Sequence, residues 1–563
     1  MGSLLGTIQQ SVGALGVSQI GLQVVGNNIA NANTPGFIRQ RLEQSSAIGT
    51  REGSLIVGHG VRPTGVVQQV DQQLFERMLS AQTSVSGSDS LLRAYGQLEE
   101  ITSDLSDRGL NNQLSLFDNA LQEWSTAPND PSLREFVLLQ AENLTETIRD
   151  NRVDAIARKE LYNGNLATAA DEVNTIIKRI AKQNIDIATI EGGGSIQSDA
   201  TGLRDQRYRD LESLAQYINI NIQEQSTGVI NVFVGGDYLI SNGIFREVVS
   251  SYNPEIGGNE VRIAETDSAL SANDGLIGAA RAARDEVFGD YIERLDRIAS
   301  SLIRSVNRVH SQGQGGSGHQ QLISTNTTDA GVPLEDAGLP FVPENGTFDI
   351  DIVDEFGETL SSHRINVRNL GTVDDSTITS VVADINAIDG LTAIVDASGF
   401  VEIRSDAPTA SFVFRDDNSG FLAAVGLNTF FTGSSALDID VNPVLLENSD
   451  RLAISKGGIG SDTDTLNELI GIMEEPLDFL GQESVRGLYE QAITGIGQRV
   501  ALQQSSSEGL GDFYATLQSQ HLAVTGVNID EESIQMISYQ RAFQASSRVI
   551  ATASEMLELL VNL

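Results

Sequence analysis

The chain has 563 residues, of which 40% are hydrophobic and 20% charged. This composition is typical of folded globular proteins, and the length requires more than one domain. The net charge is −40, from 76 acidic and 36 basic residues. Such an acidic excess argues against sequence-independent binding to nucleic acid or anionic membranes, which requires clustered Lys and Arg. The absence of cysteine excludes disulfides, thiolate zinc sites and cysteine nucleophiles.

Targeting signals are also missing from the sequence. No apolar run is long enough to span a bilayer, so we expect no membrane insertion. The N-terminus lacks the positive region of a secretory signal, because its first basic residue is Arg39. If the protein leaves the cell, we therefore expect a route without a cleaved signal peptide.

Both ends of the chain carry a narrow apolar stripe at helical spacing. The stripe near the N-terminus consists of Leu5, Ile8, Val12, Leu15, Leu22 and Ile29. The stripe near the C-terminus consists of Met536, Tyr539, Phe543, Ile550, Leu557 and Leu560. Such stripes bury little surface unless another helix covers them, so we expect the terminal helices to pair as in a coiled coil. The alternative is two ordinary amphipathic helices, each packed on a globular core.

Between these ends the hydrophobic periodicity changes from helical to strand-like and back. Helices are predicted over residues 71–217, with breaks near residues 127–131 and 191–194, and again over residues 276–310. β-Hairpins are predicted at residues 228–240, 246–264, 347–367 and 391–405. The glycine-rich residues 312–321 are predicted to form a linker. After Leu452 we expect helices with breaks at residues 509–511 and at Gly526.

These patterns predict an α+β multidomain protein in which helical segments from both ends of the chain flank a β-rich insert. We expect three parts. They are a terminal helix pair (residues 1–40 and 525–563), a helical body with β-hairpins (residues 41–311 and 453–524) and a β-rich insert (residues 312–452).

No arrangement of residues indicates an enzyme. The five histidines lack metal-binding spacing, and no Gly-x-Ser-x-Gly occurs in a strand-to-helix context. His319 is predicted to be a solvated loop residue. The acidic residues 349–358 and 414–420 lack the ligand spacing of a calcium loop, so we expect acidic surface turns there. Trp124 is predicted to belong to a core. We expect no catalytic, cofactor or metal site.

Five segments resemble the axial proteins of the bacterial flagellum. NIANANTPGF, residues 28–37, is similar to the family's N-terminal signature, and residues 538–563 resemble its closing helix. GVNIDEE, residues 526–532, is similar to the hook-associated members in particular. So are residues 57–79 and the helix that begins DQRYRDL at Asp205, in which Tyr208 and Arg209 depart slightly from the family pattern.

The resemblance implies a non-enzymatic protein that forms a ring at the junction between hook and filament. Its implied partners are further copies of itself, the hook protein, a second junction protein and a cytoplasmic export chaperone at the C-terminal helix. Export would use the flagellar type III apparatus, which fits the missing signal peptide. The hook protein or another axial component remains an alternative, as does a secreted adhesin-like protein that binds through the β-rich insert.

The asparagines before Thr34-Pro35-Gly36 exceed what a helix stop requires. Pro35 and Gly36 suffice to end the helix. Asn27 and Asn31 are four residues apart and therefore share a helical face. With Asn28 and the two apolar stripes, we expect this face to contribute to the assembly interface between subunits.

Overall fold

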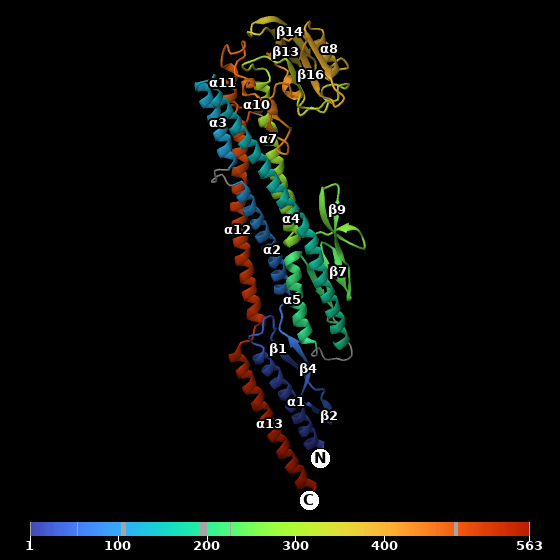
Figure 1. The fold of residues 1–563 in the computed structure, drawn as a ribbon. Helices are drawn as coiled ribbons and strands as arrows, with labels where there is room; N and C mark the ends of the chain where they lie inside the picture. Colours follow the sequence, from blue (N-terminus) through green and yellow to red (C-terminus); the bar gives the residue numbers. More distant parts are fainter. Residues whose placement is uncertain are drawn as a thin grey trace. The chain divides into compact units, whose positions relative to one another are not determined.

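The computed structural model describes residues 2–52, 55–102, 109–191, 200–225, 227–477 and 482–561. Long helices dominate and the sheets are small, so the predicted α+β class is confirmed (Figure 1). The chain divides into two compact units. The first unit comprises Met1–Ala94, Leu161–Ala283 and Ala501–Leu563, and the second comprises Tyr95–Glu160 and Arg284–Val500.

Three long helices contribute residues to both units. They are α2 (Gln72–Ile101), α4 (Pro131–Glu191) and α12 (Val485–Thr525). Because these boundaries fall inside helices, neither composition nor hydrophobic periodicity changes there, and sequence patterns do not reveal them. The three-part division expected from the sequence therefore stays a proposal.

In the first unit, α1 (Gly2–Ala30) packs against α13 (Ile529–Val561), which confirms the predicted pairing of the terminal helices. The helices approach closely at Gly21, where an added Cβ would lie 2.6 Å from the ring of Tyr539. A side chain at position 21 would thus displace the tyrosine. This contact fixes where along their length the two helices meet.

A β-ribbon follows α1. β1 (Gln40–Ser46) pairs antiparallel with β4 (Val61–Gln68), and β2 (Thr50–Glu52) pairs with β3 (Leu55–Val57). The ribbon contacts α1 closely, since an added Cβ on Gly13 would lie 2.8 Å from the carbonyl oxygen of Val61. The N-terminal helix is therefore packed on its own ribbon as well as on α13.

The rest of the first unit combines helices with two small antiparallel sheets. The sheets have the orders β5-β6-β7-β8 and β11-β10-β9. Both predicted hairpins are present, as β6–β7 and β9–β10. The elements are α5 (Thr201–Tyr217), β5 (Asn221–Glu224), β6 (Ile230–Val234), β7 (Asp237–Ser241), β8 (Ile244–Phe245), β9 (Val248–Asn253), β10 (Gly258–Ile263), β11 (Ser268–Ala269) and α6 (Gly275–Ala282).

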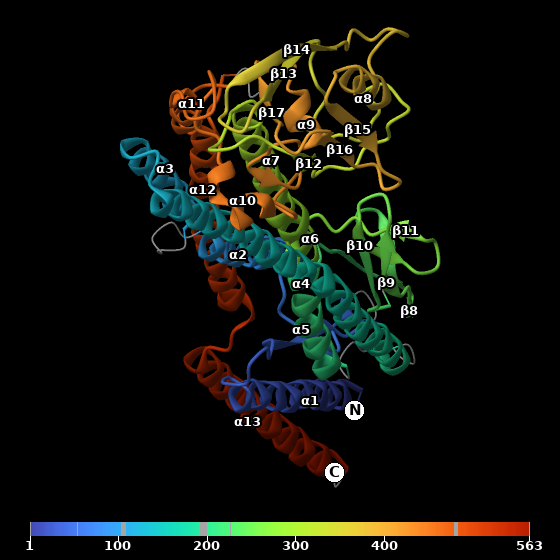
Figure 2. The same ribbon diagram turned by 45° about the horizontal axis from the view of Figure 1, so that its top comes forward.

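The second unit contains the β-rich insert. The predicted hairpins are present as β13–β14 and β15–β16, and Figure 2 shows α8 beside β15. One buried core joins these sheets to α8 and α9. The insert's elements are β12 (Gln321–Ile323), β13 (Gly346–Val353), β14 (Thr359–Val367), α8 (Ile378–Asn386), β15 (Leu391–Val395), β16 (Val401–Ser405), β17 (Ser411–Arg415), α9 (Phe421–Val425), β18 (Phe431–Thr432) and β19 (Asp440–Val441).

The remaining elements of the second unit are helical. They are α3 (Leu110–Thr126), the π-helical turn η1 (Ala283–Gly289), α7 (Asp290–His310), α10 (Pro443–Glu447), η2 (Ser449–Arg451) and α11 (Asp464–Gly471). Trp124 on α3 is fully buried, as predicted, and its indole nitrogen donates to the carbonyl oxygen of Pro128 at 3.0 Å.

The predicted linker at residues 312–321 is wrong, because this segment is packed into the second unit. Gln314 and His319 are buried and form isolated β-bridges with Ser455 and Phe412. An added Cβ on Gly315 would lie 2.5 Å from the carbonyl oxygen of Asp450. These glycines therefore serve close backbone approach and not flexibility, a distinction that composition cannot make.

The predicted acidic surface turns are also wrong at three carboxylates. Asp349 and Asp351 on β13 are buried and pair with Arg364 and Arg415, at 2.8 and 3.1 Å. Asp417 is buried and accepts hydrogen bonds from the amides of residues 419, 420 and 422 at the start of α9. Each acid has local partners that compensate its burial.

Only one of the two breaks predicted near the C-terminus exists. α12 continues through residues 509–511, whereas the chain leaves helical geometry between Thr525 and Ile529, around Gly526. No helix within the described residues is long and apolar enough to cross a membrane. The same residues contain no cluster of His, Asp or Glu arranged to hold a metal ion.

The predicted solvated state of His319 is wrong, and a second histidine, His310, is buried nearby in the sequence. The Nδ1 of His310 lies 2.9 Å from the carbonyl oxygen of Asn428, and its Nε2 accepts from the amide of Ala453 at 3.1 Å. Burial lowers the pKa of His310 to about 4. Burial, with Arg451 nearby, lowers the pKa of His319 to about 3.

These histidines predict that the second unit loses stability in acid. A histidine kept neutral by burial stabilises the fold fully above pH 6.5, and this contribution is lost as the pH falls toward 4. For His310 the loss is on the order of 3 kcal/mol. Urea unfolding between pH 7.5 and 4.5 should therefore show a shallower decline in His310→Asn. The half-buried His363 is the control: His363→Asn should keep the steep decline, and an unchanged slope in His310→Asn would refute the assignment.

Candidate functional site

The apolar side chains of the terminal helices are of two kinds, half-buried and exposed. On α13 the predicted stripe lies on the less exposed side: Met536, Tyr539, Phe543, Ile550 and Leu557 are all half-buried. The side chain of Leu560 lies outside the described residues. On α1 the stripe is split, because Ile8, Leu15, Leu22 and Ile29 are half-buried whereas Leu5 and Val12 are 57% and 54% exposed.

The side of α1 that is most buried within the chain was not identified from the sequence. It consists of Ser11, Val17, Ser18, Gly21, Val24, Val25 and Asn28. The predicted stripe was defined by large hydrophobic residues. The close packing of α1 instead uses small residues. The signal that could have found this side is the regular recurrence of Gly and Ser among valines.

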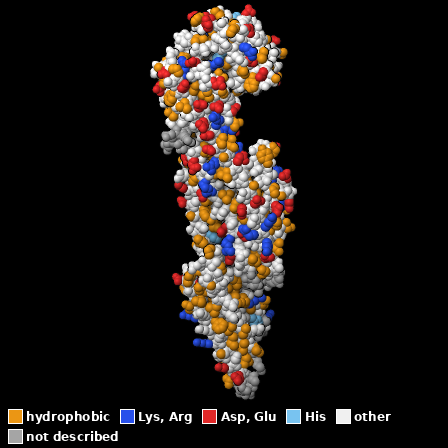
Figure 3. Space-filling view, viewed as in Figure 1, with side chains coloured by type: hydrophobic (Ala, Val, Ile, Leu, Met, Phe, Trp, Pro, Cys, Tyr) orange, Lys and Arg blue, Asp and Glu red, His pale blue; other side chains and the backbone are white. Residues whose placement is uncertain are grey.

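Hydrophobic side chains remain on the surface of both terminal helices. Figure 3 shows them gathered toward the lower end of the view, where α1 and α13 lie. The exposed members are Leu5, Val12, Ile529, Ile534, Ile537, Val549, Met556 and Leu559. Contiguous exposed apolar surface of this kind marks a contact site for another chain.

Just beyond this helix pair, three consecutive residues connect the N-terminal segment to four helices. The first connection joins Gln40 to α1. The side-chain nitrogen of the buried Asn28 donates to the carbonyl oxygen of Gln40 at 2.9 Å, and its oxygen accepts from the Gln40 amide at 3.0 Å. Asn28 also donates to Oε2 of Glu532 at 3.0 Å.

The second connection joins Arg39 to α12 and α13. Its Nε donates to Oε1 of Glu532 at 2.8 Å, and its Nη1 donates to Glu531 at 2.9 Å. The Arg39 amide donates to the carbonyl oxygen of Thr525, the last residue of α12, at 2.8 Å. Glu532 is buried and bonded by both Arg39 and Asn28, so its charge is compensated.

The third connection joins Ile38 to α5 through Asp205. This buried carboxylate accepts a hydrogen bond from the Ile38 amide and one from Nε2 of Gln68 at 2.5 Å. Burial raises the pKa of Asp205 to about 6, although these hydrogen bonds and Arg209 oppose the shift. Residues 38–40, Asn28, Asp205 and Glu532 are called the joint below.

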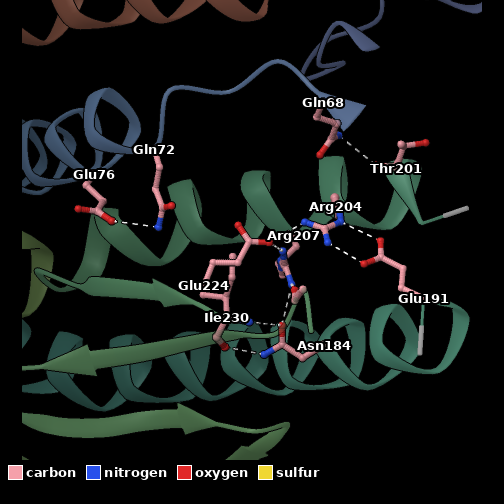
Figure 4. A network of polar contacts seen from close by, with 11 residues as sticks. Gln68, Gln72, Glu76, Asn184, Glu191, Thr201, Arg204, Arg207, Glu224 and Ile230 are labelled. Carbon is pink, nitrogen blue, oxygen red and sulfur yellow. Dashed lines mark hydrogen bonds and ion pairs between the residues drawn. The ribbon is translucent and has the colours of Figure 1, made fainter. Parts of the chain in front are cut away.

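A second network holds α5 itself in place (Figure 4). Nη1 of the fully buried Arg207 donates to Oδ1 of Asn184 on α4 at 2.9 Å and to the carbonyl oxygen of Gly228 at 2.7 Å. Arg204 forms ion pairs with Glu191 and Glu224, at 2.7 and 2.6 Å. The DQRYRDL segment thus fixes the N-terminal segment through Asp205 and the helical body through Arg207.

The asparagine face expected from the sequence needs one correction. Asn28 is not available to a neighbouring subunit, because its amide group is buried and used within the chain. Asn31 donates to the backbone oxygen of Asn27 at 3.0 Å and to its side-chain oxygen at 2.9 Å. A role for Asn27 and Asn31 in assembly stays a prediction.

Comparisons with known proteins agree with these features. The model of the flagellar hook-associated protein FlgK helical domain matches residues 95–322. Models of the flagella basal body rod protein and of the flagellar basal body rod FlgEFG protein C-terminal match residues 8–37 and 518–563. Flagellar hook-associated protein 1 of Escherichia coli (strain K12) is 24% identical over 99% of both chains. The chain is similar to flagellar hook-associated protein 1 over nearly its full length, and its residues 95–322 match the FlgK helical domain.

Similar proteins occur in distant bacteria, and one similar protein has a solved structure. Flagellar hook-associated protein 1 of Bacillus subtilis (strain 168) is 22% identical over 98% of this chain and 96% of its own. The flagellar hook junction protein FlgK from Burkholderia pseudomallei matches 80% of this chain and all of its own, with a TM-score of 0.50 and 14% identity. FlgK proteins are structural flagellar proteins, so this chain is not an enzyme.

The joint predicts unequal roles for two neighbouring asparagines. Asn28→Ala removes three hydrogen bonds and leaves buried partners unsatisfied, which should cost about 3 kcal/mol. Asn31→Ala, the matched control, removes only local bonds at the surface and should cost less than about 1 kcal/mol. Urea unfolding measures both costs, and limited proteolysis should release the terminal helices in Asn28→Ala alone. Equal effects of the two substitutions would contradict this role of Asn28.

Asp205 predicts that the first unit is more stable in mild acid. A carboxyl group whose pKa is raised by burial stabilises the fold at low pH, and this contribution is lost as the pH rises from about 4 through about 6. The urea midpoint of the first unit should therefore be higher at pH 5 than at pH 7.5. Asp205→Asn should remove the difference, because its side chain carries no charge at either pH. The same pH dependence in Asp205→Asn would exclude the carboxyl group as the cause.

Proposed function

We propose that this chain forms a ring that joins the flagellar hook to the filament. The observation that carries this proposal is the exposed apolar surface of the paired helices α1 and α13. A soluble monomer rarely leaves such surface open, and further copies of the same helix pair would cover it. The hook-associated relatives and the solved hook junction protein support the same location. The full-length relatives favour this role over that of another axial component.

The proposed partners are further copies of the chain, the hook protein on one side and a second junction protein on the other. We also propose that export proceeds without a cleaved signal peptide. Before assembly, the exposed side chains of α13 need cover, which a cytoplasmic export chaperone at this helix would supply. In the ring, the terminal helix pair would line the inner tube, the helical body would surround it and the β-rich insert would lie outermost.

A deletion strain tests the location. Without this protein, cells should assemble hooks but no filaments, and flagellin should accumulate in the medium because nothing retains it at the hook. Electron microscopy of the cell surface and immunoblots of the medium measure both effects. Motile cells with intact filaments would refute the junction role.

Single charges in the terminal stripe test the mechanism. Asp at Ile550 or Leu557 places a charge on the half-buried side of α13 and should abolish incorporation into flagella. The soluble body should stay folded, as judged by circular dichroism and an unchanged unfolding midpoint of the second unit. Leu360→Asp, at an exposed position on β14 in the insert, is the matched control and should assemble normally. Loss of folding in Ile550→Asp would contradict the separation of assembly from the body.

A further inference from the structure

The β-ribbon has a charge opposite to that of the whole chain. Residues 1–70 contain four arginines and two glutamates, a net charge of +2 in a chain with a net charge of −40. All four arginines lie between residues 39 and 62, in or beside the ribbon. Arg39 is used in the joint, whereas Arg41 and Arg62 are exposed.

Two of these arginines share one face of the ribbon. Arg41 and Glu43 alternate with buried residues along β1, and beyond a register shift at Glu43–Gln44 Arg62 on β4 pairs with Ser45 and donates from Nε to its hydroxyl at 3.3 Å. Both arginines are exposed, whereas Leu42 on the opposite face is buried. The side chain of Arg41 is 64% exposed and lies 3.7 Å from the partly exposed Glu43, a pair that contributes little to stability.

An apolar side chain accompanies this basic face. Ile48, in the turn between β1 and β2, is 83% exposed. Val57 at the end of β3 is also exposed. Burial of Ile48 against another protein would gain hydrophobic free energy, and the flanking arginines would select an acidic partner. Arg41, Ile48 and Arg62 are called the ribbon surface below.

A complementary surface lies on the part of α12 that belongs to the same compact unit. Leu502 is 72% exposed, and Phe513 is also exposed. They are eleven residues apart, about three helical turns, so they share one face. The exposed acids Glu508 and Asp512 lie one turn apart, about 140° and 100° around the helix from Phe513. Residues 501–563 contain seven acids and two arginines, a net charge of −5.

We propose that the ribbon surface of one copy binds the acidic and apolar face of α12 in a second copy. Arg41 and Arg62 would pair with Glu508 and Asp512, and Ile48 would pack against Phe513. A second copy is the partner that the charges favour. The ribbon surface combines exposed apolar side chains with arginines, whereas the face of α12 combines them with acids. The contact joins two different surfaces, so it can repeat head to tail around a ring. This contact would hold neighbouring copies together in the proposed ring, so the proposal rests on the proposed function.

Cross-linking of two singly labelled chains tests the contact directly. The chain has no cysteine, so each engineered thiol is unique. A chain with Ile48→Cys and a chain with Phe513→Cys are expressed together in the deletion strain, and assembled flagella are oxidised. A disulfide-linked dimer of the two chains is expected. The matched control replaces Phe513→Cys with Val373→Cys, a fully exposed position in the insert, and should give at least tenfold less dimer.

Two results would overturn the proposal. One is the absence of the Ile48–Phe513 dimer in cells that assemble normal flagella. The other is an equal yield with the Val373 control, which would indicate random collision. A cross-link from Ile48→Cys to a different protein in place of the dimer would also count against a second copy as the partner.

Charge reversal provides an independent measurement. The double variant Arg41→Glu, Arg62→Glu should reduce the number of filaments per cell at least tenfold, and adding Glu508→Arg and Asp512→Arg should restore most of the loss. Arg368→Glu, an exposed arginine in the insert, should have no effect. Normal assembly of the double variant would overturn the proposal. Failure of the proposed function looks different, because the deletion strain itself would then keep its filaments.

Discussion

The attachment of residues 38–40 to four helices is the constraint on which the rest of the first unit depends. Each of these three consecutive residues is bonded to a different helix or pair of helices: Ile38 to α5, Arg39 to α12 and α13, and Gln40 to α1. Their spacing is set by covalent geometry, so the four helix ends are held at fixed separations. The two terminal helices thereby meet the body at one place, although they lie at opposite ends of the sequence.

Asn28, Asp205 and Glu532, which make this attachment, are buried, so they specify one geometry. A buried carboxylate without partners costs free energy, because nothing compensates the loss of its hydration. Arrangements of the helices that leave the carboxylate unpaired are therefore disfavoured. Glu532 is compensated only when Arg39 and Asn28 both reach it. On α5, Arg207 depends in the same way on Asn184 and Gly228. Apolar packing alone would allow the helices to slide, whereas these contacts permit one arrangement.

Sequence patterns predicted the parts of this fold that depend on local periodicity. The four hairpins were found because alternating residues are bounded by glycine-rich turns, and the terminal helices were paired because their stripes needed cover. The patterns failed where tertiary contact decides the role of a residue. The glycines at 313–318 resemble a linker until their neighbours are known, and Asn28 and Asp205 look like surface residues until their partners are found. Those partners lie up to 504 residues away along the chain, beyond the range of any local pattern.

The close approach at Gly21 has a mechanical consequence. The ring of Tyr539 occupies the space that a side chain at position 21 would need, and the positions on either side of Gly21 carry side chains. If α13 shifted along α1, the ring would collide with Val17 or Val24, which lie one turn away on the same side of α1. The packed ring therefore opposes sliding of the two helices past each other. A force applied along one helix is transmitted to the other. The short non-helical connection between Thr525 and Ile529 does not loosen this pair, because Arg39 bonds Thr525 before it and Glu531 and Glu532 after it.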